Sequence, residues 1–349
     1  MRVLIVTTQV PFARGGAEMT AESLFSALVQ RGHQAEMVGI PFKWYPQDRI
    51  LDHMLASRLL DLTESGGVTI DRVIALKFPA YLIRHPNKVI WLLHQHRQAY
   101  DLWDHPVAGD LKRSPQGNLV RRAITVADTN LMAEARHIFT NSKNVAQRLK
   151  KWVGLDGSPL YCPPPGAESF YSEESEEYLF FPSRLDTLKR QLLVVEALGH
   201  TRHPVRVHFA GCSTDVGYEK KLQETTRRLG LTQRVRWLGN ISEDEKRRQY
   251  ARALAVVFPP YDEDYGYVTL EGMLSSRPVV TCTDSGGPIE LVDNRKTGLV
   301  VAPSPKELAA AFDELWGDRE QSRRWGERGR RKYDELGISW DQVVDELLR

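Results

Sequence analysis

Residues 161–166 read YCPPPG, and this stretch separates two halves of the sequence that repeat one pattern. Three successive prolines cannot continue a helix or lie in a central strand, because proline lacks an amide hydrogen and fixes its own φ angle. On both sides of the stretch, short apolar runs alternate with segments of helical periodicity. The stretch therefore predicts a stiff connector between two domains of similar architecture.

The alternation predicts that each half forms a parallel sheet covered by helices. Ala17–Arg31, for example, has an apolar helical face, and Gly32 is placed to end that helix. Further helices are expected at Glu219–Leu229 and Ser242–Arg252. Ligands of such open sheets bind outside the carboxyl ends of the strands. The expected strands are Val3–Thr7, Gln34–Val38, Arg72–Leu76, Val89–Leu93, His137–Thr140, Tyr178–Phe181, Val205–Ala210, Val235–Leu238, Ala255–Phe258, Val279–Thr281 and Leu299–Val301.

The composition is that of a globular protein, with 42% hydrophobic and 26% charged residues, and 349 residues suffice for two domains. A formal net charge of +2 gives no reason to expect a nucleic-acid partner. No apolar run approaches the length of a membrane span, and the N-terminal run is too short for a signal peptide. We expect a cytoplasmic protein, at most peripheral at the inner face of a membrane.

The cysteines and one basic segment suggest no special chemistry. Cys162, Cys212 and Cys282 are odd in number and far apart, which argues against a disulfide framework or a zinc site and predicts buried thiols. Basic residues crowd the segment 323–332, which we expect to be a solvated helical face. Weak contact of this segment with acidic lipid is the alternative.

Two segments contain residues suited to phosphate. RGGAE at 14–18 places Gly15 and Gly16 in a strand-to-helix turn, where the backbone can approach a ligand and free amides favour an anion. It lacks the G-x-G-x-x-G dinucleotide fingerprint, and an ordinary turn is the alternative. FPSRLDTLKR at 181–190 places Arg184 and Lys189 at the carboxyl end of an expected strand. These two cations can neutralise a diphosphate, although a solvated charge pair has the same pattern.

Two glutamates bracket the segment EDYGYVTLE at 263–271, which follows another expected strand. Glu263 can accept hydrogen bonds from sugar hydroxyls and Glu271 from a ribose, while the amides between them can line phosphates. Glu263 as a solvated loop acid and Glu271 as a surface helix residue are the alternative. Glu271 lies in a largely apolar stretch, however, where a carboxylate needs a partner.

A pair of histidines ends the strand-like segment WLLHQHR at 91–97. His94 and His96 alternate along an extended chain and can point to the same side. A metal site there would need more ligands, and no carboxylate or cysteine cluster lies nearby in the sequence. We expect His94 to face the ligand site, with a structural role as the alternative.

These segments, in this order, resemble the retaining family 4 glycosyltransferases, part of glycosyl transferases group 1. The resemblance continues through PPPGAESFY, VRWLGNIS, SGGPIELV and TGLVV, and it covers nearly the whole chain. It implies the GT-B fold, in which two Rossmann-like parallel-sheet domains face each other across a cleft. Residues 1–163, with a C-terminal helix at about 334–349 (Trp340–Leu348 fits it), would bind the acceptor. Residues 164–333 would bind the nucleotide-sugar donor.

The resemblance also implies roles for single residues. Arg184 and Lys189 would hold the donor diphosphate, Glu263 the sugar hydroxyls and Glu271 the ribose. His94 would lie beside the reactive carbon of the sugar, and with Arg184, Lys189 and Glu263 it forms the expected catalytic set. Many family members have Phe where this chain has Tyr265 or Tyr267, so the donor fit can differ. Further donor contacts are implied for Gly15, Gly16, Leu238, Gly239, Asn240, Tyr265, Gly266 and Tyr267.

The expected reaction is retaining, metal-independent transfer of a hexose to a saccharide or lipid-linked saccharide, as in polysaccharide biosynthesis. The donor would be a UDP-sugar such as UDP-glucose, or secondly GDP-mannose; it is a substrate, UDP or GDP is a product, and no cofactor is implied. Three alternatives remain open. Asp262-Glu263-Asp264 has the form of a D-x-D metal motif of metal-dependent transferases. A nucleotide-sugar epimerase on the same fold and a non-catalytic binder of nucleotide sugars are the others.

Overall fold

The computed structural model describes residues 1–213 and 215–349, and the chain divides into two compact units. Unit 1 comprises Met1–Pro165 together with Ser339–Arg349, and unit 2 comprises Gly166–Ile338. The first division falls directly after the third proline of the connector, at 165/166, where the sequence had suggested 163/164. The second falls at 338/339, ahead of the last helix, where the sequence had suggested 333/334.

Unit 1 is built on a six-stranded sheet of order β2-β1-β5-β6-β7-β8, in which every pair is parallel. Its strands are β1 (Arg2–Gln9), β2 (Gln34–Pro41), β5 (Arg72–Lys77), β6 (Lys88–His94), β7 (His137–Thr140) and β8 (Ser158–Pro159). The antiparallel hairpin β3 (Glu64–Ser65) and β4 (Val68–Thr69) stands apart. All of β5 and nearly all of β6 are buried, which explains their continuous apolar sequence.

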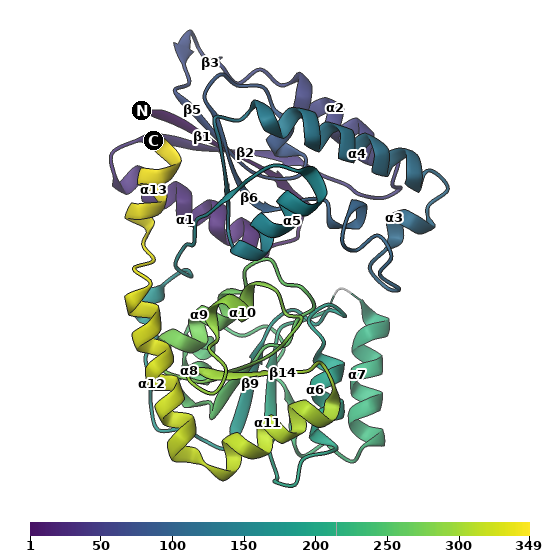
Figure 1. Ribbon diagram of the computed structural model, residues 1–349, viewed down its shortest axis with the longest axis vertical. Helices are drawn as coiled ribbons and strands as arrows, with labels where there is room; N and C mark the ends of the chain where they lie inside the picture. The colour runs from purple at the N-terminus through teal and green to yellow at the C-terminus, as the bar shows by residue number, and fades with distance from the viewer. Residues whose placement is uncertain (214) are drawn as a thin grey trace. The chain divides into compact units, whose positions relative to one another are not determined.

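The helices of unit 1 include one from the far end of the chain. They are α1 (Gly16–Gln30), α2 (Arg49–Leu59), α3 (Asp110–Arg113), α4 (Gly117–Leu131), α5 (Lys143–Val153) and α13 (Trp340–Leu348), with short 3-10 turns at Ala80–Leu82, Arg97–Ala99 and Met132–Glu134. Helix α13 lies beside α1 (Figure 1), where Arg31 pairs with Asp345 at 2.6 Å. The Trp340 ring meets the edge of Trp91, with centroids 6.1 Å apart. The last helix is therefore part of the first core.

Unit 2 has a six-stranded parallel sheet of order β11-β10-β9-β12-β13-β14. Its strands are β9 (Tyr178–Pro182), β10 (Arg206–Ala210), β11 (Val235–Trp237), β12 (Ala255–Val257), β13 (Val279–Cys282) and β14 (Gly298–Val301). Its helices are α6 (Gln191–Leu198), α7 (Val216–Arg228), α8 (Glu243–Arg252), α9 (Tyr267–Leu274), α10 (Gly287–Leu291), α11 (Pro305–Gly317) and α12 (Arg319–Glu335), with a 3-10 turn at Ala167–Ser169. Counted within the unit, the strand order is 3-2-1-4-5-6, which is the Rossmann order.

The strand order of unit 2 sets the position of a ligand site. Strand β9 is central, and the chain leaves it toward β10 on one side and later returns as β12 on the other. Loops that follow β9 and β12 therefore diverge at the carboxyl edge of the sheet, and this switch point is where doubly wound sheets bind ligands. The loop after β9 contains Arg184 and Lys189, and the loop after β12 contains Glu263.

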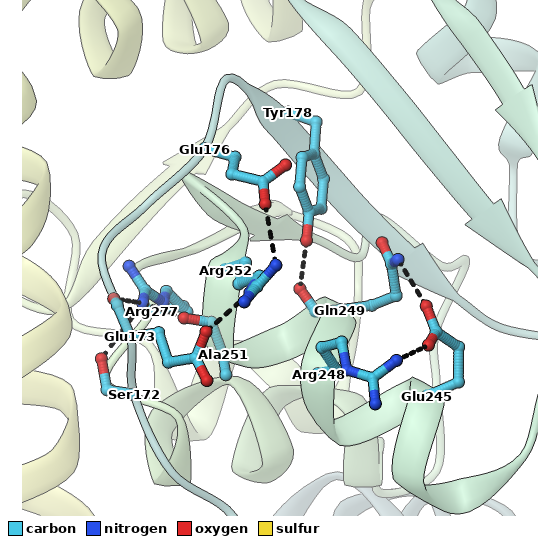
Figure 2. A network of polar contacts seen from close by, with 10 residues as sticks. All are labelled: Ser172, Glu173, Glu176, Tyr178, Glu245, Arg248, Gln249, Ala251, Arg252 and Arg277. Carbon is cyan, nitrogen blue, oxygen red and sulfur yellow. Dashed lines mark hydrogen bonds and ion pairs between the residues drawn. The ribbon is translucent and has the colours of Figure 1, made fainter.

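A polar network holds the segment before β9 to helix α8 (Figure 2). Arg252 pairs with Glu173 at 2.6 Å and with Glu176 at 3.4 Å, and the Tyr178 hydroxyl donates to the Gln249 carbonyl at 2.9 Å. Arg277 donates to the carbonyls of Glu173 and Ala251. Helix α8 is thereby fixed to the sheet, which matters because its other residues support the site described below.

The sequence predictions of the strands and of α7, α8 and α13 are confirmed to within about three residues at each end. The hairpin β3–β4 and strand β8 were not predicted, because two-residue strands are too short for any periodicity. The prediction of three buried thiols is wrong for Cys212, which is exposed because it follows β10 in a surface loop. Within the described residues all three cysteines are free.

The basic segment lies on α12, and its cations face nearby carboxylates. Arg323 pairs with Glu320 at 2.9 Å and Arg330 with Asp334 at 3.2 Å; Arg330 is half-buried and the other three residues are exposed. This agrees with a solvated helical face, since paired charges attract an acidic lipid surface less strongly. Among the described residues, no helix is both long enough and apolar enough to cross a membrane.

Candidate functional site

An ion pair joins the two loops at the switch point of unit 2. Lys189 Nζ lies 2.5 Å from Glu263 Oε2, and the two side chains are 18% and 21% exposed. The ammonium group also lies over the Phe258 ring, 5.4 Å from its centroid. The sequence had assigned these residues to different parts of a ligand, and the structure shows them in direct contact.

The loop after β9 is shaped by its own side chains. Asp186 Oδ1 accepts a hydrogen bond from the Leu188 amide at 2.8 Å, and the Asp186 carbonyl accepts one from the Lys189 amide at 3.0 Å. The buried side chain of Gln191 accepts a hydrogen bond from the Asp186 amide at 3.3 Å and donates one to the Arg184 carbonyl at 2.8 Å. Gln191 therefore fixes the curvature of the loop that presents both cations, a role that the sequence did not indicate.

Arg190 connects this loop to the one after β13. Its backbone is left-handed, with φ of 63°, and its guanidinium binds Asp284 through two hydrogen bonds of 2.8 and 2.7 Å. Burial lowers the pKa of this guanidinium, but the hydrogen bonds and charge of Asp284 outweigh burial and raise it. The guanidinium also lies over the Tyr261 ring, 5.1 Å from its centroid. A bidentate pair of this kind fixes orientation as well as distance.

The loop after β12 is held by backbone hydrogen bonds on both sides of Glu263. The Asp262 and Glu263 amides donate to the carbonyls of Asp284 and Ser285 at 2.9 and 3.0 Å. The Glu263 carbonyl accepts from the Gly287 amide at 2.8 Å. Asp262 is itself left-handed, with φ of 44°. Such conformations cost free energy and persist only where the surroundings impose them, which is common at ligand sites.

Glu271 is buried on α9 and has two partners on α8. Its Oε1 lies 3.2 Å from Lys246 Nζ, and its Oε2 accepts the Tyr250 hydroxyl at 2.6 Å. Burial lowers the pKa of Lys246, but Glu271 and Glu243 raise it above its usual value. Burial also raises the pKa of Tyr250 well above its usual value, so the phenol remains a donor. A buried carboxylate thus has the partners that the sequence required of it, although neither partner was predicted.

The stretch Leu238–Asn240, for which the resemblance implied donor contacts, follows β11 and adjoins the loop after β10. The Gly239 carbonyl accepts the Gly211 amide at 2.7 Å, and the Leu238 amide donates to Phe209 at 2.8 Å. A Cβ atom on Gly211 would lie 2.3 Å from the Ser183 carbonyl oxygen, so only glycine lets these loops approach. Asn240 is exposed beside them.

Arg184 differs from Lys189 in its surroundings. Its side chain is exposed and has no hydrogen bond or ion pair with any described residue.

The three residues expected to offer amides lie at the start of α9: Tyr265 is buried, Gly266 is left-handed with φ of 86°, and the Tyr267 ring meets that of Tyr265 at 5.3 Å. The helix starts at Tyr267 in the segment after β12, so its N-terminus lies at the same carboxyl edge of the sheet as the loop of Lys189.

Unit 1 has a polar cluster of its own at the carboxyl edge of its sheet. Glu18 Oε2 accepts the Gly15 amide at 2.9 Å, and its Oε1 lies 2.5 Å from Lys77 Nζ. Lys77 ends β5 and is in register with His94, which ends β6. Gly16 begins α1. The predicted residues Gly15, Gly16 and His94 are thus on neighbouring elements, with Glu18 and Lys77 as members that the sequence did not indicate.

His94, the last residue of β6, and His96, two residues after it, have different surroundings. His94 Nδ1 is 3.0 Å from the Gln95 carbonyl. His96 packs against Phe78 and Phe42, with ring centroids 5.3 and 6.3 Å away, and burial chiefly lowers its pKa to about 4. His96 is therefore neutral and is packed among aromatic side chains. No three His, Cys, Asp or Glu side chains converge into a possible metal cage within residues 1–213 and 215–349.

Comparison with known proteins identifies the family of unit 2. Residues 168–332 match the family model described as glycosyl transferases group 1. Unit 2 therefore belongs to glycosyl transferases group 1, the family that the sequence motifs indicated.

Two curated relatives extend this likeness. An alpha-1,3/1,6-mannosyltransferase of Dictyostelium discoideum is 30% identical over 125 residues, which cover 36% of this chain and 30% of the relative. A D-inositol 3-phosphate glycosyltransferase of Nocardia farcinica is 27% identical over 64% of this chain and 54% of the relative. The chain thus spans about half or less of the length of these relatives.

Two solved structures share the fold over nearly the whole chain. Sucrose-phosphate synthase of Thermosynechococcus elongatus has a TM-score of 0.80 at 16% identity and covers 99% of this chain and 97% of its own. Anabaena HepE, solved in complex with UDP-glucose, has a TM-score of 0.73 at 16% identity and covers 99% of this chain and 98% of its own. The predicted GT-B class, with two Rossmann-like parallel-sheet units, is confirmed.

Proposed function

We propose that this chain is a glycosyltransferase that moves a hexose from a nucleotide diphosphate sugar to a saccharide or lipid-linked saccharide, with retention of configuration. The observation that carries the proposal is the Lys189–Glu263 pair at the switch point of the second sheet, 2.5 Å apart. A cation and a carboxylate at that point match the two chemical parts of the donor, because a diphosphate needs positive charge and a sugar needs hydroxyl acceptors. The matched family of unit 2 supports the same class of reaction.

The donor is assigned to unit 2, part by part. Arg184, which is exposed, and Lys189, which is partly buried, bind the diphosphate, assisted by the amides of Tyr265, Gly266 and Tyr267 near the start of α9. Glu271 accepts hydrogen bonds from the ribose, since each of its oxygens keeps a lone pair beyond those used by Lys246 and Tyr250. The base lies over the stretch Leu238–Asn240.

The proposed chemistry leaves the proton on the leaving group. The bond between the anomeric carbon and the phosphate oxygen breaks, a bond to the acceptor oxygen forms on the same face, and the leaving diphosphate takes the acceptor's proton. Negative charge grows on the diphosphate as that bond breaks, so Arg184 and Lys189 stabilise the transition state more than the ground state. These two cations supply the charge that a metal provides in other transferases, and the proposed reaction is therefore independent of metal.

A UDP-sugar is the favoured donor, because a structure of similar fold was solved with UDP-glucose. GDP-mannose is second, because one relative carries the name of a mannosyltransferase. We assign acceptor recognition to unit 1. Its residues Gly15, Gly16 and His94, on neighbouring elements of its polar cluster, keep the donor roles that the resemblance implied. The site of action is proposed to be the cytoplasm, with peripheral attachment to the inner membrane face as an addition to be tested.

Product analysis tests the proposal. Purified protein is incubated with UDP-glucose or GDP-mannose, with and without a panel of saccharide acceptors, in the presence of EDTA. Transfer to an acceptor with an α-linkage from the α-linked donor is the expected result. Epimerised donor, binding without turnover, or activity abolished by EDTA would each reject a different part of the proposal.

A further inference from the structure

We propose that Glu263 is a counter-ion that competes with the donor diphosphate for Lys189, and that this competition makes the site select nucleotide sugars over bare nucleoside diphosphates. The inference rests on the proposed function, because it assigns a second duty to two residues of the donor site. The proposed function assigns Lys189 to the diphosphate and Glu263 to the sugar. The new element is that Lys189 exchanges Glu263 for the diphosphate when the donor binds.

The contact shows that the charges of Lys189 and Glu263 neutralise each other. Lys189 Nζ and Glu263 Oε2 are 2.5 Å apart, and both side chains are about one-fifth exposed. Water screens such a pair only in part, so each group lowers the availability of the other. Exposed Arg184, in contrast, stays available to an arriving anion. The site therefore has one exposed cation, Arg184, and a second cation, Lys189, that is paired with a carboxylate.

Only the side chains can respond to a ligand here, because both backbones are fixed. The Lys189 amide is bound to the Asp186 carbonyl at 3.0 Å. The amide and carbonyl of Glu263 are bound to Ser285 and Gly287 at 3.0 and 2.8 Å. The Lys189 and Glu263 side chains, in contrast, retain several rotatable bonds and reach each other from separate loops. Exchange of partners thus requires rotamer changes and no rearrangement of the loops.

The chemistry of the ligand decides whether the exchange is favourable. A bare diphosphate approaches Lys189 against the charge of Glu263, and it offers no hydrogen-bond donor to that carboxylate. A nucleotide sugar brings hydroxyl groups that donate to Glu263, so the carboxylate turns to the sugar and Lys189 turns to the phosphate. After transfer, the diphosphate product has lost those hydroxyls. Glu263 then returns to Lys189 and favours release of the product.

The neighbouring pair Arg190–Asp284 holds the loops together independently of Glu263, so the counter-ion role of Glu263 can be tested without changing the loop structure. That pair is bidentate and joins the loop after β9 to the loop after β13. The Tyr261 amide adds a backbone bond to the Leu188 carbonyl at 2.7 Å. These contacts remain when Glu263 is changed to glutamine, so the variant is expected to keep the loop structure.

The test compares the binding of two ligands to Glu263→Gln by calorimetry, without acceptor. UDP and UDP-glucose are the probes, with GDP and GDP-mannose as the second pair. We expect the variant to bind the bare diphosphate roughly tenfold more tightly than the wild type and the nucleotide sugar no more tightly, or more weakly. The preference for the sugar-bearing ligand thus falls by about tenfold or more. Glu196→Gln on α6 removes the same charge elsewhere in the unit and is expected to leave the preference unchanged.

The outcomes separate the inference from the proposed function. Equal changes for both ligands, or no tighter binding of the bare diphosphate, overturn the counter-ion duty while leaving the transferase intact. A wild-type protein that binds neither ligand pair overturns the donor site and, with it, the inference. A variant that has lost its fold is recognised by its thermal unfolding, and Glu263→Asp, which keeps the charge but withdraws it from Lys189, then serves in its place with the same expected direction.

Discussion

Tyr250 donates its hydroxyl hydrogen to Glu271 across 2.6 Å, from the buried face of α8 to the buried face of α9. Lys246 lies one helical turn before Tyr250 and contacts the other carboxylate oxygen at 3.2 Å. Because both partners come from one helix, the orientation of the carboxylate depends on the position of α8. That position is set in turn by the network around Arg252 and Gln249 (Figure 2).

Tyr250→Phe removes one partner of Glu271 and keeps the ring in its aromatic contacts. We expect the free energy of unfolding to fall by about 1–3 kcal/mol, because a buried carboxylate loses a hydrogen bond. The donor KM is expected to rise several-fold with little change in kcat, since the ribose does not react. Chemical denaturation measures the change in stability, and initial rates measure the change in KM.

In Glu271→Gln, the preference for a ribose donor over its 2′-deoxy analogue should shrink. An unchanged preference would contradict the assignment of Glu271 to the ribose.

Lys189→Ala removes the cation that faces the developing charge on the diphosphate. Loss of one such group is expected to raise the barrier by ~2–4 kcal/mol and to lower turnover by on the order of 10² or more. The measurement is kcat at saturating donor. Lys221→Ala on α7 removes an exposed lysine of the same unit and should retain the wild-type rate. A Lys189→Ala rate close to that of the wild type contradicts the assigned role.

Asp284→Asn breaks the bidentate pair with Arg190 and leaves a half-buried guanidinium without its charge partner. We expect a loss of about 1–3 kcal/mol in unfolding free energy. Turnover should also fall, because Arg190 follows Lys189 directly and holds its loop. Glu314→Gln is the matched control: Arg295 also has a left-handed backbone and binds Glu314 at 2.7 and 3.0 Å, but at a more exposed place. Similar losses of turnover in both variants would contradict the loop-holding role.

Much of the fold was readable because parallel central strands are continuous apolar runs: β5 and β9 are buried throughout, and β6 is buried except for its last residue. The position of Lys189 and Glu263 at loops of one sheet edge followed from the same pattern. Their direct contact did not, because it depends on β9 and β12 being neighbours, and strand order has no local signature. Supporting partners were missed for the same reason: Asp284 is 94 residues from Arg190, and Lys246 is 25 from Glu271.

Buried polar side chains in the core were also not predicted from the sequence. Asp128 in unit 1 is fully buried, yet on an amphipathic helix it resembles a solvated acid. It accepts hydroxyl groups from Tyr100 and Tyr81 at 2.7 and 2.9 Å and an amide from Gln95 at 3.4 Å. Burial raises the pKa of Asp128 to about 6 against 3.8 in solution, although these hydrogen bonds oppose the rise.

This raised pKa predicts how the stability of unit 1 changes with pH. The folded state binds the proton of Asp128 more tightly than the unfolded state, so the contribution of this group to stability is complete below pH 3.8 and is lost as the pH rises through about 6. The full difference is a few kcal/mol, from about 1.4 kcal/mol per unit of pKa. Asp128→Asn keeps the shape but cannot ionise. The unfolding temperature of the variant, measured by thermal denaturation, should therefore rise relative to that of the wild type as the pH is raised from 4 to 7.5. A difference between the two proteins that stays constant over this range would show that Asp128 does not titrate in the folded state, and a gain toward acid pH would reverse the sign of the prediction.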